Sequence, residues 1–317
     1  MKFGIMGAAS IAPRFIEAVK KVKGAEVTAI ASRSFQKAID FAKRHQIDTA
    51  FGKYEDLCRS PEIDAVYIAT TMNCHFDNVM LCISHGKHVL CEKPMFLTEE
   101  EGKKAYEAAR KADVFLMEGL WSLFLPPIKR ARELIEQDAI GEVAFAESRF
   151  AFYKPYDPEH RLFRKSLGGG ALYDLGVYNI AVSSFLFDEL PETASGKTIL
   201  SDSGVDMMDT VSLKFPSGRL AQFSCGFLYD MDNSMTVYGS KGKIVLKDRF
   251  LSPNCLELWQ GKEKIQVFDF EECGFEFEIS EAVDCIKKRR KQSKVHPVKS
   301  SIAYARVFDL LLKQWDL

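Results

Sequence analysis

The sequence predicts an α/β protein of two domains: an N-terminal domain built on a parallel sheet, and a C-terminal α+β domain with a large, open, mostly antiparallel sheet. Three observations predict this fold. The chain has 317 residues, which is long for a single hydrophobic core. Its first 120 residues alternate short apolar runs with stretches of helical period. After residue 141, longer segments alternate polar and apolar residues and are separated by turn signals.

Five apolar runs in the first part are typical of strands that are buried on both faces of a parallel sheet. They are KFGIM (2–6), EVTAIA (26–31), DAVYIA (64–69), HVLC (88–91) and VFLM (114–117). Between the runs, apolar residues recur at helical spacing, for example from Ile11 to Val22 and from Phe76 to Ile83. Such a sheet has helices on both faces and binds its ligands beyond the carboxyl ends of its strands.

The pattern changes near residue 124, and we place the domain boundary so that the domains are 1–122 and 123–317. A proline pair in FLPPIKRARELIEQ starts a helix there. Helix-like segments follow near 171–187, 275–290 and 301–315. Four alternating segments predict strands with one wet face: EVAFAESRFAFY, DTVSLKF, RLAQFSCGF and KGKIVL.

Helices packed on only one face of this second sheet would leave the other face uncovered. A large uncovered sheet face would expose an apolar patch, and such patches usually mark an interface. We therefore expect a homodimer formed through that face, and a monomeric mass at micromolar concentration would contradict this expectation.

Composition excludes several classes of partner. The chain has 43 Lys and Arg against 44 Asp and Glu, so neither nucleic acid nor a membrane surface is expected as the main partner. The basic run KKRRKQSK near residue 290 is interpreted as a solvated helix end. The sequence contains no apolar stretch of transmembrane length, and its start is interpreted as a first strand rather than a signal peptide. Eight scattered cysteines without CxxC pairs or zinc spacing predict a reduced, cytoplasmic protein with no metal site.

The first strand leads into GAASIA, residues 7–12, and then into a helix. A dinucleotide fingerprint needs small residues here, because the backbone turns tightly and meets the pyrophosphate at the helix N-terminus. Gly7 fills the turn position, Ala9 replaces the second glycine, and Ala12 fills the close-packing position. We expect a Rossmann-type nucleotide site, with an ordinary tight turn as the alternative. The expected contacts of this segment are Gly7, Ala8, Ala9, Ser10 and Ile11.

The end of the second strand indicates which nicotinamide dinucleotide is preferred. Ser32, Arg33 and Ser34 follow Ala31, and no carboxylate is present to bind the ribose 2′-hydroxyl of NAD. Arg33 can pair with a 2′-phosphate, and the flanking hydroxyls can donate to it. NADP(H) is therefore favoured over NAD(H). In the alternative, Ser34 caps the next helix and Arg33 is solvated, and both interpretations can hold together.

Two further segments follow the ends of predicted parallel strands. They are TTMNCH (70–75) and CEKP (91–94). Lys93 lies between an acid and a proline, and the proline can fix a cis peptide bond that aims the lysine side chain. In the alternative, Lys93 is a surface residue paired with Glu92. The residues of these segments expected at the cofactor are Thr70, Thr71, Asn73, His75, Glu92 and Lys93.

The segment GGGALYDLGVYN, residues 168–179, places Asp174 and Tyr178 one helical turn apart on the same face. Such a pair serves either packing or proton chemistry. Trp121, after the last strand of the first domain, and Phe150, on a later strand, are candidates for the wall of a substrate pocket. Structural packing is the alternative for both aromatic residues.

These motifs, in their order and spacing, resemble the glucose–fructose oxidoreductase/inositol dehydrogenase/MocA family. The segments that carry the resemblance are GIMGAASIA, ASRS, HGKHVLCEKP, MEGLWSLFLP and LGGGALYDLGVYNI. It covers about the first 190 residues with specific motifs and the rest by pattern. Within the family the chain is most similar to the branch of dimeric dihydrodiol dehydrogenases and NADP-dependent D-xylose dehydrogenases.

The resemblance implies a dinucleotide-binding domain and a second domain that binds substrate and dimerises through its open sheet. It implies hydride transfer between NADP(H) and a hydroxyl or carbonyl of a sugar, polyol or trans-dihydrodiol. By position, Lys93 is the lysine of the family's EKP motif and Asp174 the acid of its C-terminal motif. Many members have a histidine four residues after that acid, whereas this chain has Tyr178.

Hydride transfer from an alcohol needs a base for the hydroxyl proton. An isolated tyrosine titrates too high for this role, and a lysine cation nearby would favour its ionised form. Lys93 and Tyr178 belong to different domains, so they can meet only across an interdomain cleft, and either can carry the proton. Asp174 can orient substrate hydroxyls. The alternatives are an NADP-sensing regulatory protein of the same fold and an NADPH-dependent reductase of a keto sugar such as 1,5-anhydrofructose.

Overall fold

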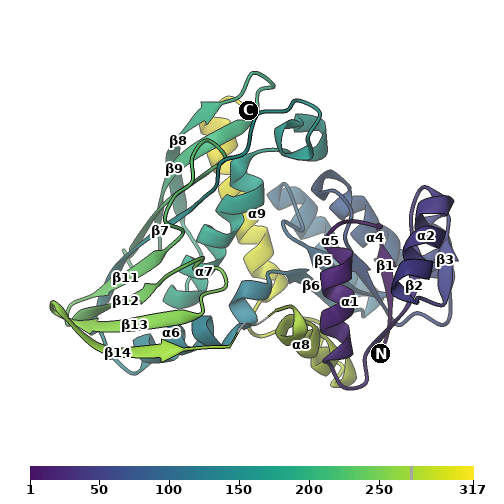
Figure 1. Cartoon of the computed structure of the whole chain (residues 1–317), viewed down its shortest axis with the longest axis horizontal. Coiled ribbons are helices and arrows are strands. Elements are labelled where there is room, and N and C mark those ends of the chain that lie inside the picture. Colours follow the sequence, from purple (N-terminus) through teal and green to yellow (C-terminus); the bar gives the residue numbers. More distant parts are fainter. Residues whose placement is uncertain (272–273) are drawn as a thin grey trace. The chain divides into compact units, whose positions relative to one another are not determined.

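The computed structural model describes residues 1–271 and 274–317 and divides into two compact units (Figure 1). Unit 1 comprises Met1–Trp121 and Gly274–Ile302, and unit 2 comprises Ser122–Cys273 and Ala303–Leu317. The chain first passes from unit 1 to unit 2 after Trp121, one residue before the expected end of the first domain. The expected second domain, however, ran unbroken from 123 to 317, whereas residues 274–302 return to unit 1. They do so because α8 (Glu276–Lys287) packs against α1 (Ala12–Lys20).

Unit 1 contains a six-stranded parallel sheet in the order β3-β2-β1-β4-β5-β6, which confirms the predicted doubly wound architecture. The first two strands have the predicted bounds, and β6 begins two residues later than predicted. The short strand β3 was not predicted. The strands are β1 (Lys2–Met6), β2 (Glu26–Ala31), β3 (Thr49–Phe51), β4 (Ala65–Ile68), β5 (His88–Glu92) and β6 (Leu116–Gly119).

Helices cover both faces of this sheet (Figure 1). α1 and α8 pack together on one face, and α4 packs between α3 and α5 on the other. The strand order reverses between β1 and β4, and ligands of such sheets bind at that switch point. The remaining helices are α2 (Phe35–His45), α3 (Tyr54–Arg59), α4 (His75–Ser84) and α5 (Glu99–Ala112), with a 3₁₀ turn, η1 (Met72–Cys74).

Unit 2 contains an eight-stranded sheet in the order β14-β13-β12-β11-β7-β10-β9-β8. Every neighbouring pair is antiparallel except β7 and β10, which confirms the predicted open, mostly antiparallel sheet. The strands are β7 (Val143–Ala151), β8 (Thr193–Leu200), β9 (Asp206–Lys214), β10 (Leu220–Gly226), β11 (Met235–Gly239), β12 (Gly242–Leu246), β13 (Cys255–Gln260) and β14 (Glu263–Asp269).

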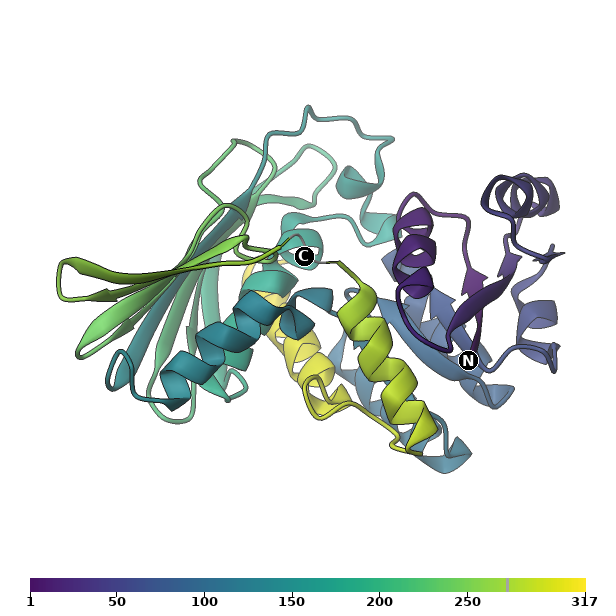
Figure 2. The same ribbon diagram turned by 60° about the horizontal axis from the view of Figure 1, so that its bottom comes forward.

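Helices α6 (Pro126–Glu136), α7 (Val177–Phe187) and α9 (Val298–Gln314) lie against one face of this sheet (Figure 2). A buried hydrogen bond of 2.7 Å from Ser148 on β7 to Asn179 on α7 ties helix to sheet. At the β8 edge of the sheet, Trp315 Nε1 donates to the carbonyl of Gly196. Among the described residues, no helix combines the length and the apolar character that a membrane span requires.

Within residues 1–271 and 274–317, no helix covers the opposite face of the sheet, as predicted, and the centre of that face is polar. A shallow depression there is lined by charged, amide and hydroxyl side chains of β7, β10 and β11, including Glu147, Arg149, Gln222, Ser224 and Thr236. The prediction of an apolar patch is therefore wrong for the middle of this face. The reason is that successive side chains of a strand point to opposite faces of the sheet. The apolar side chains face the helices, and the polar side chains face outward.

One glutamate of this sheet gives a testable contribution to stability. The carboxylate of Glu257 on β13 is almost fully buried, and it accepts from Lys247 (2.9 Å), Lys264 (2.8 Å) and Trp259 Nε1 (2.9 Å). Burial alone would raise its pKa, but the hydrogen bonds from Lys264, Lys247 and Trp259 outweigh burial and lower the pKa from 4.5 to about 2. Because the folded pKa is the lower one, the stabilisation is complete above pH 4.5 and is lost as the pH falls toward 2.

We therefore expect Glu257→Gln to lower the free energy of unfolding by about 1–3 kcal/mol at pH 7, the typical value for a hydrogen-bonded buried charge. The difference from wild type should shrink as the pH is lowered from 5 toward 2, as measured by urea unfolding. Glu263→Gln, at an exposed position on the next strand, is the matched control and should have little effect. The second pH, 2.5, is chosen close to the folded pKa of about 2. If Glu257→Gln lowered the free energy of unfolding equally at pH 7 and at pH 2.5, the lowered pKa of Glu257 would be contradicted.

Candidate functional site

The turn after β1 has the geometry of a nucleotide-binding loop. Gly7 has a φ of +108°, and a Cβ there would lie 3.0 Å from the carbonyl oxygen of Ala69, which follows β4. Only glycine fits this conformation and this close approach. The N–H of Gly7 donates to the carbonyl of Ala31 at the end of β2 (2.9 Å). Gly7 thus brings the carboxyl ends of β1, β2 and β4 together.

The N-terminus of α1 follows this turn and carries no side-chain cap. Ile11 occupies the cap position without accepting a hydrogen bond, and Pro13 lies in the first turn. The first N–H groups of a helix need acceptors, and an uncapped helix start after a tight glycine turn suits the pyrophosphate of a dinucleotide. The residues Ala8, Ala9 and Ser10 form the backbone that leads into it.

Arg33 lies beyond the end of β2 and is exposed. Burial raises the pKa of Tyr54 on α3, and the positive charge of Arg33 opposes this effect. Ser34 accepts from the N–H of Lys37 (3.4 Å) and caps α2, so the capping interpretation is confirmed. Ser32 is buried, and its hydroxyl accepts from the N–H of Ser34 (3.4 Å). No carboxylate occupies residues 32–34, the position of the NAD-selective acid.

His75 is the first residue of α4 and connects the two segments that follow β4 and β5, residues 70–75 and 91–94, which we call the rim segments. Its Nδ1 lies 2.8 Å from the carbonyl oxygen of Pro94, and its Nε2 lies 3.0 Å from that of Thr70. Burial lowers the pKa of His75 despite these two acceptors, which favours a neutral ring that donates to one of them. The Thr70 hydroxyl accepts from the amide of Asn78 (2.9 Å). His75 therefore holds the rim together, while Asn73 is exposed and Thr71 is partly buried.

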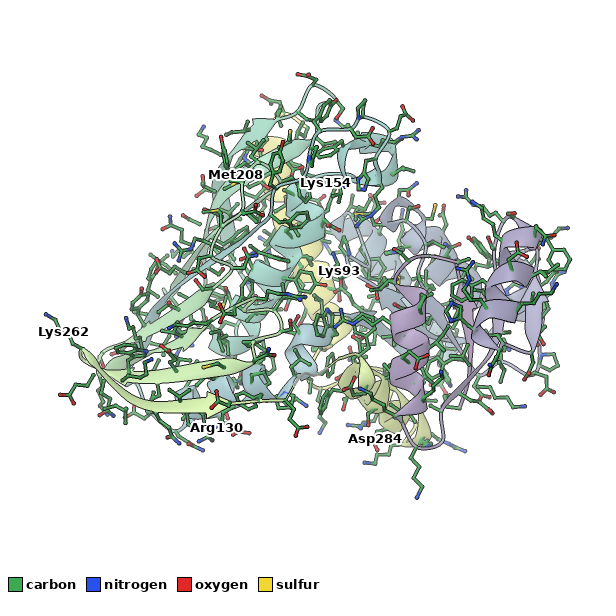
Figure 3. All side chains as sticks on the ribbon, in the orientation of Figure 1. Lys93, Arg130, Lys154, Met208, Lys262 and Asp284 are labelled. Carbon is green, nitrogen blue, oxygen red and sulfur yellow. The ribbon has the colours of Figure 1, made fainter. Side chains whose placement is uncertain are left out.

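Lys93 follows β5 and is partly buried (Figure 3). The Lys93–Pro94 peptide bond is cis, as the sequence suggested. The N–H of Lys93 donates to its neighbour Glu92 (3.3 Å), and Glu92 also accepts from the phenol of Tyr67. Burial raises the pKa of Glu92, although Tyr67 and Lys93 oppose this effect. A partly buried acid therefore lies next to the lysine.

Glu118 on β6 holds the backbone that follows Lys93–Pro94. It is buried and accepts from the N–H of Met95 (2.9 Å), the hydroxyl of Ser301 (2.6 Å) and Nε2 of His296 (3.0 Å). Burial raises its pKa, but the bonds to His296, Ser301 and Met95 together prevail and lower it. The ionised Glu118 thus fixes the backbone just after Lys93–Pro94.

Trp121, proposed for the pocket wall, packs within unit 1. Its ring lies 5.5 Å from that of Phe275, and the guanidinium of Arg14 lies 4.5 Å from the centre of the Trp121 ring. Only 4% of Trp121 is exposed. These contacts support the packing interpretation for Trp121.

The glycine-led helix of unit 2 begins with a wider turn than the α-helical period predicted. Residues Leu172–Gly176 form a π-helical turn that continues into α7. Such turns are rare and frequently lie at functional sites. Asp174 lies within this turn, is buried, and accepts from Arg161 Nη1 (3.2 Å). The arginine partner was not predicted, because it lies 13 residues earlier, in a separate 3₁₀ turn (Arg161–Phe163).

Tyr178 lies on the first turn of α7 with 7% of its surface exposed. The ring of Phe150 on β7 meets it edge to face at 5.9 Å and also contacts the ring of Phe250 at 6.1 Å. Phe150 therefore lies beside the tyrosine, consistent with both packing and a pocket wall. The predicted site residues divide between the units: the nucleotide set, Lys93 and Trp121 belong to unit 1, and Phe150, Asp174 and Tyr178 to unit 2.

Comparisons with known proteins agree with both units. A family model described as "Oxidoreductase family, NAD-binding Rossmann fold" matches residues 1–120, and one described as "GFO/IDH/MocA C-terminal domain" matches residues 128–245. The chain is 33% identical over 326 residues to trans-1,2-dihydrobenzene-1,2-diol dehydrogenase of Xenopus tropicalis, covering 99% of this chain and 97% of that protein. It is 30% identical over 328 residues to the enzyme of that name from Homo sapiens, covering 99% and 96%.

Solved structures share the fold at lower identity. Aldose-aldose oxidoreductase from Caulobacter crescentus, complexed with glycerol, has a TM-score of 0.88 at 23% identity, and 99% of this chain and 96% of that chain are covered. Levoglucosan dehydrogenase, in complex with NADH and levoglucosan, has a TM-score of 0.89 at 18% identity with the same coverage. Fold and comparisons together define an oxidoreductase with a nucleotide-binding Rossmann domain. The chain belongs to the GFO/IDH/MocA family.

Proposed function

We propose that this oxidoreductase transfers hydride between NADP(H) and a CH–OH or carbonyl group of a sugar, a polyol or a trans-dihydrodiol. The observation that carries the proposal is the full-length similarity to dihydrodiol dehydrogenases in a chain that has both Lys93 and Tyr178. Unit 1 is proposed to bind the nucleotide, and unit 2 to bind substrate and to form a homodimer through its open sheet face.

The residues of unit 1 fit a bound dinucleotide. The tight turn at Gly7 and the uncapped start of α1 suit the pyrophosphate, while Arg33 suits the 2′-phosphate of NADP. When bound, the nicotinamide supplies the hydride chemistry. Thr70, Thr71 and Asn73 are proposed to line the rim, with His75, Glu92 and Glu118 keeping the rim segments in place.

The protein then has to bind the substrate and to move one proton. Tyr178 and Lys93 are proposed to act on the same substrate hydroxyl, with the lysine cation favouring the ionised phenol. Asp174, held by Arg161, is proposed to accept hydrogen bonds from neighbouring substrate hydroxyls. Phe150 would pack against the ring of a sugar or cyclic diol beside Tyr178.

A panel of aldoses, cyclic polyols and trans-dihydrodiols, assayed with NADP⁺ by nicotinamide absorbance, tests this function. We expect turnover of at least one class. Reduction of a keto sugar by NADPH, without oxidation of any alcohol in the panel, would identify the keto-sugar reductase instead. Tight NADPH binding without any turnover would favour the regulatory, NADP-sensing alternative and contradict the proposal.

Cofactor preference has its own test at Arg33. Replacing Arg33 by Asp should raise the KM for NADPH about 10- to 100-fold, because a charge-assisted contact to the 2′-phosphate becomes a repulsion. The KM for NADH should change by less than about threefold, since NADH has no 2′-phosphate. Lys37→Asp, on the exposed surface of α2, is the charge-matched control. Equal effects of Arg33→Asp on the two cofactors would contradict the NADP assignment.

A further inference from the structure

Two buried aspartates of unit 2 lie beneath the start of the helix that carries Asp174 and Tyr178. Asp206 is 2% exposed and Asp209 is 0% exposed, and both belong to β9. Residues three apart on a regular strand face opposite sides of a sheet. The β8–β9 register shifts between Ile199 and Leu200, opposite the first residues of β9. This irregularity lets both acids reach the side of the sheet that faces the helix.

Asp206 contacts the helix start directly. Its Oδ2 accepts from the N–H of Leu172 at 2.6 Å, and the N–H of Ala171 also favours its charged form. These are backbone donors that a helix leaves unpaired at its first turn. A carboxylate here complements both the N–H groups and the positive end of the helix dipole.

The glycine before the helix is required by the same contact. Gly170 has a φ of +129°, and a Cβ at this position would collide with Oδ1 of Asp206. The carbonyl of Gly170 in turn accepts from the N–H of Asp174 (3.3 Å). The third glycine of GGG therefore serves the approach of Asp206 to the helix backbone.

Asp209 has a different environment. It faces Cys225 on the paired strand β10, whose thiol donates to Oδ2 of Asp209 at 3.5 Å. Burial and the neighbouring Asp206 raise the pKa of Asp209 well above its ordinary value. Burial also raises the pKa of Asp206, but the N–H groups of Leu172 and Ala171 oppose this effect there. Two adjacent buried carboxyls do not both ionise readily, so the proton belongs on Asp209 and the charge on Asp206.

We propose that Asp206 is a positioning residue for the reaction: its carboxylate fixes the first turn of the helix that presents Asp174 and Tyr178. This inference rests on the proposed function, in which Tyr178 transfers a proton and Asp174 orients the substrate. The effect of Asp206 is proposed to pass through the helix backbone rather than through a contact with the substrate.

The two aspartates provide a matched pair of variants. Asp206→Asn removes the charge and replaces one of the two acceptor oxygens by an NH₂ donor, whereas Asp209→Asn replaces a protonated acid by a neutral group of similar shape. We expect Asp206→Asn to lower kcat about 10- to 100-fold, as for a small displacement of catalytic groups, with NADPH affinity unchanged. Asp209→Asn should keep kcat within about threefold of wild type. A kcat of Asp206→Asn near wild type, or equal losses in both variants, would overturn the proposal.

Hydrogen exchange of the Leu172 amide provides a readout that needs no substrate. Asp206→Asn should speed this exchange at least about tenfold and Asp209→Asn should not, because the Leu172 N–H donates to Asp206 and a neutral amide is a weaker acceptor than a carboxylate. If wild type turns over no substrate, the proposed function fails, and this asymmetry still tests the role of Asp206. Should Asp206→Asn not fold, Asp206→Glu keeps the charge and displaces the carboxylate by one methylene. It is expected to lose kcat at least about fivefold, and wild-type kcat in that variant would overturn the proposal.

Discussion

Replacing Tyr178 by phenylalanine should lower kcat by about 100- to 10,000-fold, the usual contribution of a positioned acid or base. The change removes one hydroxyl and keeps the ring that packs edge to face with Phe150, so the fold should be retained. The dissociation constant of NADPH should stay within about twofold, because the proposed nucleotide contacts all belong to unit 1.

The measurement is kcat on whichever substrate of the panel turns over, together with NADPH binding by fluorescence. Tyr153→Phe removes a hydroxyl from an exposed tyrosine of the same unit and should leave both quantities unchanged. Turnover retained in Tyr178→Phe would remove this tyrosine from the proton path and leave Lys93 as the candidate.

Replacing Lys93 by methionine should lower kcat by about 100- to 1,000-fold. Methionine keeps most of the unbranched stem and removes only the cation. Without the cation, the phenolate of Tyr178 is less favoured, so the pH at which kcat rises should move to higher values. The pH profile therefore separates an electrostatic role of Lys93 from a loss of packing.

Lys93→Arg is the informative companion, because it keeps the charge and changes the geometry; it should retain the wild-type pH profile at a reduced rate. Lys103→Met, on the exposed face of α5, controls for the loss of a lysine elsewhere in unit 1. A Lys93→Met protein with wild-type kcat and an unshifted profile would exclude Lys93 from the chemistry.

The parallel sheet of unit 1 could be predicted closely because its strands are short, continuous and separated by helical repeats. The runs 2–6 and 26–31 coincide with β1 and β2. The three residues of β3 were missed because so short a run carries no period. Glu118 also lay outside the prediction, although an acid inside an apolar strand is a usable signal. Its partner His296 lies 178 residues away, a separation that no local pattern encodes.

In unit 2, the helix that carries Asp174 and Tyr178 was predicted from its period, but its first turn was not. A π-helical turn depends on tertiary contacts of the backbone. Here the N–H of Leu172 donates to Asp206, and Gly170 allows that carboxylate to come close. The segment DMMD reads as part of a strand, and only the shifted β8–β9 register brings both of its acids to the helix side. Long-range register of this kind has no signature in a single sequence.

Isotope transfer distinguishes NADP-linked hydride transfer at a CH–OH carbon from any other reaction of the substrate. The panel substrate that turns over is synthesised with deuterium on the carbon that is oxidised and incubated with NADP⁺ and wild-type protein. We expect deuterium at C4 of the NADPH formed, a primary isotope effect on the transfer step, and almost no labelled NADPH from Tyr178→Phe. Product that forms without label in NADPH, or a panel without any product despite NADPH binding, would contradict NADP-linked hydride transfer.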